Sequence, residues 1–398
     1  MLAVALLALA VFYNAVLAVA VSNGINVGYS GVAAVEIAIT LVCVILVFST
    51  GFSSRDVVPL TLLWFIAVLA IIASISYNSL YIGSVRNFAI IAVFSMLGQR
   101  MEFRYVRIAF ALVSAATLLV LIWEIANVES YAAFFSPARY YEATRGVATS
   151  EFDDSGLSVG TIAFEGRFSL GIFSGRRTSS IFLEQVSINS YAIICMIFLN
   201  GAWSRLAWKE RVLQIVTIFL IVASNNARMG ALMCIVMPVG YFLFPFISRY
   251  LIAAVPFLII SSIFAMSSRL ENAVGDDVTG RLGVTYRLLT RFELPEYFVG
   301  NPLSVGHMFD SGYAFVLASI GFFGGLAYLA FITLYPKFDT PEQKRGAWSS
   351  AVYILAWLTV GGTATFSIKT AALLWAFIGC LSVIPRETPV SAVPRRQR

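Results

Sequence analysis

Long apolar runs alternate with short polar connections along almost the whole chain. A helix needs roughly 20 mostly apolar residues to cross the hydrocarbon core of a bilayer. The first run lacks a preceding basic region and is longer than the apolar core of a secretory signal, so we interpret it as a helix as well. The pattern predicts an all-α polytopic membrane protein, a single integral membrane domain over 1–398. About twelve transmembrane helices are expected, at 2–21, 32–49, 57–75, 80–98, 108–127, 181–200, 212–226, 229–247, 251–266, 311–335, 347–361 and 364–385.

The composition agrees with this pattern. Of 398 residues, 59% are hydrophobic and 12% are charged, whereas soluble domains are near half apolar and about a quarter charged. Soluble enzymes, coiled coils, disordered chains and collagen-like fibres are therefore excluded. One histidine and four scattered cysteines do not form a metal-ligand pattern, so we expect no metal ion and no other cofactor.

The net charge of +6 comes from basic clusters in short loops, which gives no reason to expect nucleic-acid binding. Cytoplasmic loops of membrane proteins collect Lys and Arg. In a twelve-helix count all of these clusters fall on one side, together with both termini. We therefore predict a multi-pass membrane protein with both termini in the cytoplasm. The clusters are Arg100, Arg104 and Arg107; Arg205, Lys209 and Arg211; Lys337, Lys344 and Arg345; and Arg386, Arg395, Arg396 and Arg398.

Two long hydrophilic segments then lie on the opposite, outer side, at 128–180 and 267–310. Loops of this length are usually functional or disordered. Both contain aromatic and charged residues rather than low-complexity sequence, so we expect ordered loops that carry the site.

Ten cations in or near these loops are all arginine, the side chain suited to a bidentate grip on phosphate. An anionic ligand such as a diphosphate is the functional interpretation, and solvated loop charges paired with nearby acids are the alternative. Arg228 interrupts an apolar stretch, where a charge usually faces a functional cavity. The ten are Arg139, Arg145, Arg167, Arg176, Arg177, Arg228, Arg269, Arg281, Arg287 and Arg291.

His307 is the only histidine and precedes the tenth apolar run. A neutral imidazole near a hydroxyl group can accept its proton, as a general base does. An interfacial hydrogen-bonding role is the alternative. Asp310 is a candidate to orient His307 or to replace it as the base. Glu36 and Glu124 lie in or beside helices without an evident partner, and the pairs Asp153-Asp154 and Asp276-Asp277 are interpreted as solvated acids.

Three stretches together resemble a known family. The first runs from Arg177 to Gln185 and on to Asn189, the second is 224–230 with Arg228 near its end, and the third runs from Gly280-Arg281 through His307 to the glycines at 321–325. In this order they resemble the O-antigen polymerase and O-antigen ligase superfamily, particularly exopolysaccharide polymerases of the xanthan and succinoglycan type. Met308 stands where ligases commonly have asparagine, which favours a polymerase.

The resemblance implies a GT-C-like glycosyltransferase architecture and a metal-independent, inverting polysaccharide polymerase of the bacterial inner membrane, with both long segments and the active site on the periplasmic side. Its substrates would be undecaprenyl-diphosphate-linked oligosaccharide and the growing polysaccharide, with membrane lipid, a chain-length regulator and a flippase as partners. Arg177, Arg228 and Arg281 would bind the diphosphate, and His307 would deprotonate the acceptor hydroxyl. Arg176, Glu184, Arg287 and Asp310 are expected to support them. Candidates for stacking on sugar rings are Tyr140, Tyr141 and Phe168, although an interfacial aromatic belt explains them equally well. The alternatives are a ligase that delivers glycan to a terminal acceptor and a twelve-helix transporter or lipid flippase.

Overall fold

The computed structural model describes residues 1–152, 155–158, 169–173, 176–273, 275, 277–361 and 363–384. The described residues form helices and connections and contain no strand; an isolated bridge pairs Phe152 with Ser158. The prediction of an all-helical fold is therefore confirmed for this part of the chain.

A long helix occurs at each apolar run. Their ends differ from the predicted ones by at most six residues, at the start of α16. These helices are α1 (Leu2–Ser22), α2 (Tyr29–Ser49), α3 (Val57–Ser76), α4 (Gly83–Gln99), α5 (Phe103–Ala126), α8 (Gln185–Ala202), α9 (Trp208–Asn225), α10 (Arg228–Leu243), α11 (Tyr250–Ala265), α15 (Gly312–Leu334), α16 (Pro341–Trp357) and α17 (Ile368–Leu381).

Among the described residues, seven helices are long and apolar enough to cross a membrane, namely α1, α2, α3, α5, α8, α10 and α15. α11 and α17 are shorter apolar helices. Large apolar side chains also face outward, such as Trp64, Ile75 and Phe246, which are 67%, 76% and 87% exposed. Apolar surface of this kind is stable against lipid rather than water, so the protein is embedded in a membrane.

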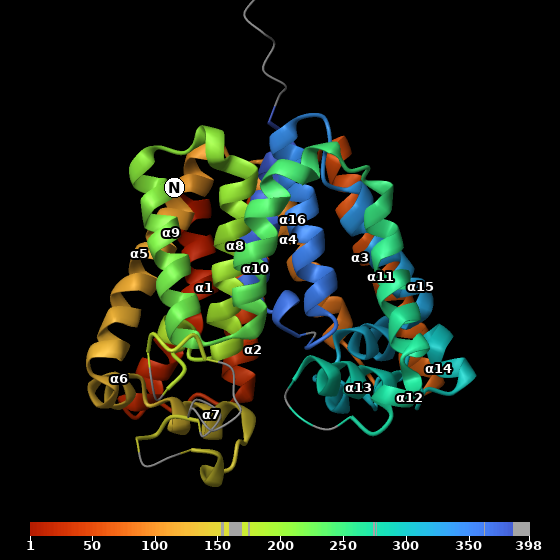
Figure 1. Ribbon diagram of the computed structural model, residues 1–398, viewed down its shortest axis with the longest axis horizontal. Helices are drawn as coiled ribbons and strands as arrows, with labels where there is room; N and C mark the ends of the chain where they lie inside the picture. Colours follow the sequence, from red (N-terminus) through yellow and green to blue (C-terminus); the bar gives the residue numbers. More distant parts are fainter. Residues whose placement is uncertain are drawn as a thin grey trace, which may run out of the picture.

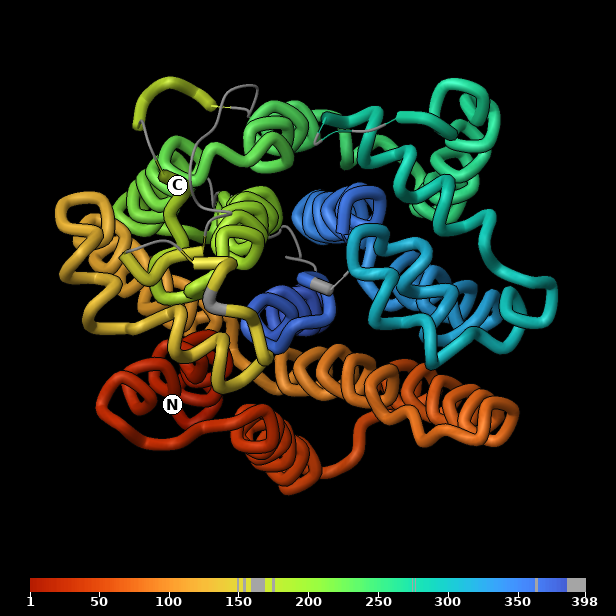
Figure 2. The backbone as a smooth tube through the Cα atoms, turned by 90° about the horizontal axis from the view of Figure 1, so that it is seen from below, coloured from red at the N-terminus to blue at the C-terminus, as the bar shows by residue number. Residues whose placement is uncertain are grey.

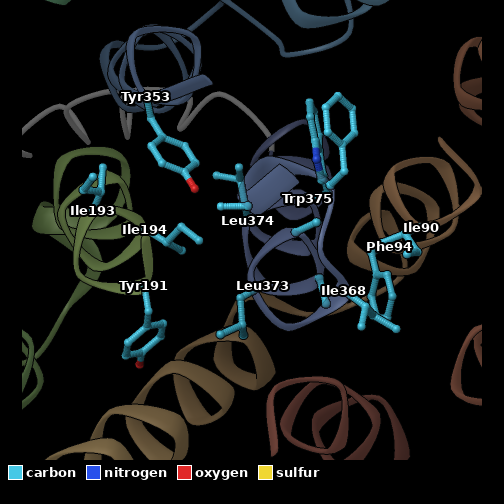
Figure 3. Close-up of a cluster of buried hydrophobic side chains, with 14 of the residues drawn as sticks. Ile90, Phe94, Tyr191, Ile193, Ile194, Tyr353, Ile368, Leu373, Leu374 and Trp375 are labelled. Atoms are coloured by element: carbon cyan, nitrogen blue, oxygen red, sulfur yellow. The ribbon is translucent and has the colours of Figure 1, made fainter. Parts of the chain in front are cut away.

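α17 lies at the centre of the bundle, where every one of its side chains is buried. Figure 3 shows Leu373 and Leu374 facing Ile194 of α8, with Ile90 and Phe94 of α4 on the other side. α4 and α17 approach closely through glycines: a Cβ at Gly98 would lie 2.0 Å from the Ala376 carbonyl oxygen, and one at Gly379 would lie 2.1 Å from that of Ser95. Small residues allow such close helix packing within membranes.

Short helices occur in both long hydrophilic segments and lie at the same end of the bundle (Figure 1). The amino terminus of the chain lies at the other end. We call the end with the short helices the loop end. The short helices are α6 (Val128–Phe135), α7 (Pro137–Arg145), α12 (Ser267–Leu270), α13 (Val278–Leu289) and α14 (Leu294–Val299).

Viewed from the loop end, the first hydrophilic segment covers the half of the bundle that contains α1 and α5 (Figure 2). The second covers the half that contains α11 and α15. The opposite end is held by ion pairs: Arg100 contacts Asp56 at 2.7 Å, and Arg107 contacts Glu210 at 2.7 Å. The basic residues there are thus partly used to join neighbouring helices.

α15 is bent at Gly321, whose φ of 63° departs from helical geometry. A Cβ at this position would lie 2.1 Å from the Phe298 carbonyl oxygen of α14, so glycine is required both for the backbone conformation and for the close approach. The bend lets residues 312–320 lie beside α14, where the amide of Asn301 donates to the Ala318 carbonyl. The second hydrophilic segment is thereby fixed against the membrane part of the fold.

Candidate functional site

The turn between α9 and α10 brings two of the predicted arginines together. α9 ends at Asn225, and Asn226 follows in the left-handed conformation with φ of 50°. Arg177 Nε donates to the Asn225 carbonyl oxygen at 2.7 Å, and half-buried Arg228 is the first residue of α10. Arg177 is thus bonded to the end of α9, and Arg228 begins the next helix, whose amino terminus has a partial positive charge. This arrangement suits an anionic ligand.

A second group forms where α13 meets the segment before α15. The Asp277 carboxylate accepts from the Gly280 amide at 2.7 Å and caps α13, which fixes the helix turn that carries Arg281. Arg281 Nη1 donates to Asp310 Oδ1 at 3.2 Å. His307 ends the 3₁₀ turn Val305–His307 and is exposed. Arg281 and Asp310 thus contact each other at the loop end, and His307 lies exposed three residues before Asp310 in the chain.

The predicted pairing of His307 with Asp310 requires revision. The turn ends at His307, whereas Asp310 lies in the connection before α15, so the two do not share a helix turn. Asp310 instead pairs with Arg281. Asp310 therefore orients a guanidinium group in this structure, and His307 is exposed.

The supporting residues have identifiable contacts. Arg176 Nη1 donates to Ser155 Oγ at 2.8 Å, which ties the end of the first segment to its middle. Arg287 Nη1 donates to the carbonyl oxygens of Leu270, Glu271 and Ala273 at 2.9 to 3.3 Å. These carbonyls lie at and just after the carboxyl end of α12, where helix carbonyls lack partners within the helix, so Arg287 has a structural role here.

The prediction that Tyr140 and Tyr141 stack on sugars is wrong. They are 2% and 8% exposed, and their hydroxyls donate to Asn14 Oδ1 at 2.6 Å and to the Leu183 carbonyl at 2.9 Å. These tyrosines anchor α7 to the bundle instead. Phe168, Asp153, Asp154 and Asp276 lie outside the described residues.

Lys369 is a charged residue of this region that sequence reasoning missed. It lies in the first turn of α17 and is 3% exposed; its Nζ contacts Glu184 Oε2 at 2.5 Å. Arg145 pairs with the other carboxylate oxygen, and Ser187 Oγ donates to the carboxylate at 2.6 Å. Burial alone would raise the pKa of Glu184, but Lys369 and Arg145 outweigh it and hold that pKa well below its usual range.

The segment before Glu184 has an unusual backbone that several side chains hold. Ser180 and Leu183 have positive φ values of 47° and 59°, which cost free energy for residues other than glycine. Glu124 accepts from the amide of Ser180 at 2.7 Å, and the Tyr131 hydroxyl donates to the Ser180 carbonyl, also at 2.7 Å. This explains the otherwise unassigned Glu124: it holds the strained link between Arg177 and Glu184.

Asn189 of α8 is a second polar residue that lies close to the α9–α10 turn. A Cβ at Gly230 would lie 2.2 Å from Asn189 Oδ1, so glycine is needed for α10 to begin here. Within the part of the chain that the structure describes, this buried oxygen has no hydrogen-bond partner. A buried acceptor of this kind is costly unless a water or another group satisfies it.

Glu36, the other acid without an evident partner in the sequence, accepts from the Tyr13 hydroxyl and lies 3.5 Å from Arg86. The described residues contain no cluster of three or more His, Cys, Asp or Glu side chains suited to a metal ion. The candidate site therefore consists of arginines at the loop end with an exposed histidine.

No family model, curated protein or solved structure matches this chain. The functional argument therefore depends on the geometry of the loop end and on the resemblance of its motifs.

Proposed function

We propose that the protein is a membrane-embedded polysaccharide polymerase that transfers glycan from undecaprenyl diphosphate to an acceptor sugar hydroxyl. The observation that carries the proposal is that the loop end of an apolar bundle holds Arg177 and Arg228 at the α9–α10 turn and Arg281, Asp310 and exposed His307 in the second hydrophilic segment. A lipid-linked diphosphate needs cations at the membrane surface and an apolar medium for its chain. The loop end of this protein offers both.

The topology is part of the same proposal. Twelve spans would place the loop end in the periplasm and the basic clusters, with both termini, in the cytoplasm of a bacterial inner membrane. The Arg100–Asp56 and Arg107–Glu210 pairs lie at the opposite end and are compatible with this orientation. Their arginines belong to the basic clusters and also join neighbouring helices.

In the proposed reaction His307 removes the proton from the acceptor hydroxyl, and that oxygen attacks the anomeric carbon of the donor. The bond from this carbon to the diphosphate oxygen breaks, and its electron pair stays on the diphosphate. Arg177, Arg228 and Arg281 stabilise this charge, as preorganised cations do in a site of low dielectric. A single displacement of this kind inverts the anomeric configuration.

Turnover by the purified protein tests the proposal. In detergent, with a defined undecaprenyl-diphosphate oligosaccharide and no ion gradient, the wild-type protein should lengthen the glycan. His307→Ala and Arg281→Ala should fold but lose at least a hundredfold in rate, since general-base catalysis contributes about 10²–10⁴-fold. Arg104→Ala is the matched control, because Arg104 is 63% exposed and lies in the first turn of α5, at the end of the bundle opposite the loop end. Normal polymer from both site variants would overturn the assignment.

The same experiment separates the alternatives. Loss of chain length with one repeat unit still attached to the final acceptor indicates a polymerase, whereas loss of attachment indicates a ligase. A transporter or flippase would give no product in detergent, because transport makes no covalent bond.

A further inference from the structure

A cavity of about 330 Å³ lies between α11 and α15 and is lined almost entirely by apolar side chains. Phe257 and Phe264 come from α11, and Leu326 and Leu329 come from the part of α15 that follows the bend at Gly321. After the bend, the lining residues of α15 extend from Phe322 to Ile332, about 15 Å of helix at 1.5 Å per residue. The cavity therefore reaches from the loop end well into the apolar part of the bundle.

The rim of this cavity faces the outside of the protein. Phe257, Phe264 and Phe322 are 50%, 42% and 39% exposed. Because the surrounding surface is apolar and faces lipid, a hydrocarbon chain that enters the cavity from the side stays in an apolar medium throughout.

The cavity is joined to the charged group at the loop end by two short pieces of chain. Tyr313, which lines the cavity, follows Asp310 by three residues, and Asp310 holds Arg281 at 3.2 Å. Leu289 lines the cavity from α13, eight residues after Arg281 on the same helix, or about 12 Å along its axis. An amphiphile with an anionic head and an apolar chain matches this combination.

We propose that the cavity binds the head-proximal isoprene units of the polyprenyl diphosphate while Arg281 holds its diphosphate. This inference rests on the proposed function and assigns the substrate's lipid part to a place in the fold. Lipid chains are as apolar as the cavity wall, so there is little hydrophobic gain from leaving the bilayer. The cavity thus positions the chain, and the arginines supply the affinity.

Gly325 allows the cavity to be filled with little disturbance of the fold. A Cβ at Gly325 would meet only Val316 Cγ1, at 3.6 Å, an ordinary contact distance. Gly325→Leu should therefore fold and place its side chain in the cavity. Ala330→Leu is the matched control, because Ala330 lies on the exposed face of the same helix and does not line the cavity.

The probe is undecaprenyl diphosphate with a diazirine on its second isoprene unit, added to the full-length protein in detergent. We expect cross-links on the lining residues of α11 and α15, prevented by excess unlabelled undecaprenyl diphosphate but not by phosphatidylglycerol. Gly325→Leu should reduce them at least fivefold and slow glycan transfer, whereas Ala330→Leu should leave both unchanged. Gly325→Ala, with a smaller side chain, should fall between, and thermal unfolding midpoints check that all variants fold.

Cross-links outside the cavity, or cross-links that Gly325→Leu and Gly325→Ala both leave unchanged, would overturn the inference. Equal displacement by phosphatidylglycerol would also overturn it and would indicate a site for ordinary phospholipid. The probe carries no sugar, so its binding does not require transfer. Specific cross-linking by a protein that never transfers glycan would refute the polymerase alone, and transfer that Gly325→Leu leaves intact would refute the cavity alone.

Discussion

Replacing Lys369 with methionine tests how the buried charges hold the loop end together. Lys369 is 3% exposed, and its partner Glu184 is 23% exposed. Removing one partner of a buried ion pair typically costs about 3–5 kcal/mol, because the remaining charge stays in a medium of low dielectric. Arg145 still pairs with Glu184 in this variant and is 49% exposed, so we expect the lower end of this range, about 3 kcal/mol.

A double-mutant cycle separates the pair from its surroundings. Glu184→Gln combined with Lys369→Met removes both charges, so the double variant should be destabilised by about 2 kcal/mol less than the sum of the single changes. The measurement is the free energy of unfolding of the purified protein in detergent micelles. Lys337→Met is the control: Lys337 lies 3.8 Å from Asp339 in a pair that is 39% and 60% exposed, and such pairs contribute at most about 1 kcal/mol. If the free-energy costs of the two single variants add up to the cost of the double variant within about 0.5 kcal/mol, the reasoning is refuted.

Two further changes test the α9–α10 turn. Gly230→Ala would place a Cβ 2.2 Å from Asn189 Oδ1, so we expect a loss of about 1–3 kcal/mol in unfolding free energy; an unchanged value would show that the turn adapts. Arg177→Lys keeps the charge but not the fork that reaches both the Asn225 carbonyl and a ligand. We expect a roughly tenfold or larger loss in kcat/KM with a normal unfolding midpoint, and wild-type kinetics would exclude Arg177 from the site.

The positions of the long helices could be predicted from the sequence because apolar run length is a direct physical requirement of the bilayer. The largest error shows where this rule fails. α16 begins at Pro341 rather than near 347, because Thr340 caps it through Gln343 and its first turns are polar. Lys344 and Arg345 there donate to the carbonyls of Pro245 and Tyr241, contacts that no hydropathy pattern contains.

The loop-end contacts were less accessible to sequence reasoning. Glu184 and Lys369 are 185 residues apart in the chain, and their pairing depends on how α7, α8 and α17 pack. One signal was present: a lysine inside an apolar run is costly and usually has a partner. The tyrosines of α7 were misjudged because aromatic residues in a loop serve equally well as buried anchors, and only the packing of that helix decides between the two roles.

The buried contacts explain how a membrane bundle can present charged groups precisely. Lipid provides no strong force that drives helices together, so polar contacts and close packing must fix the loop end. Glu124 holds the strained backbone at Ser180, and Lys369 reaches the Glu184 carboxylate and, at 3.5 Å, the Phe182 carbonyl. Arg177 lies directly before this segment and bonds to the end of α9. The buried acids and Lys369 therefore act through the backbone that carries Arg177, which is why their loss should disturb substrate binding without any contact to substrate.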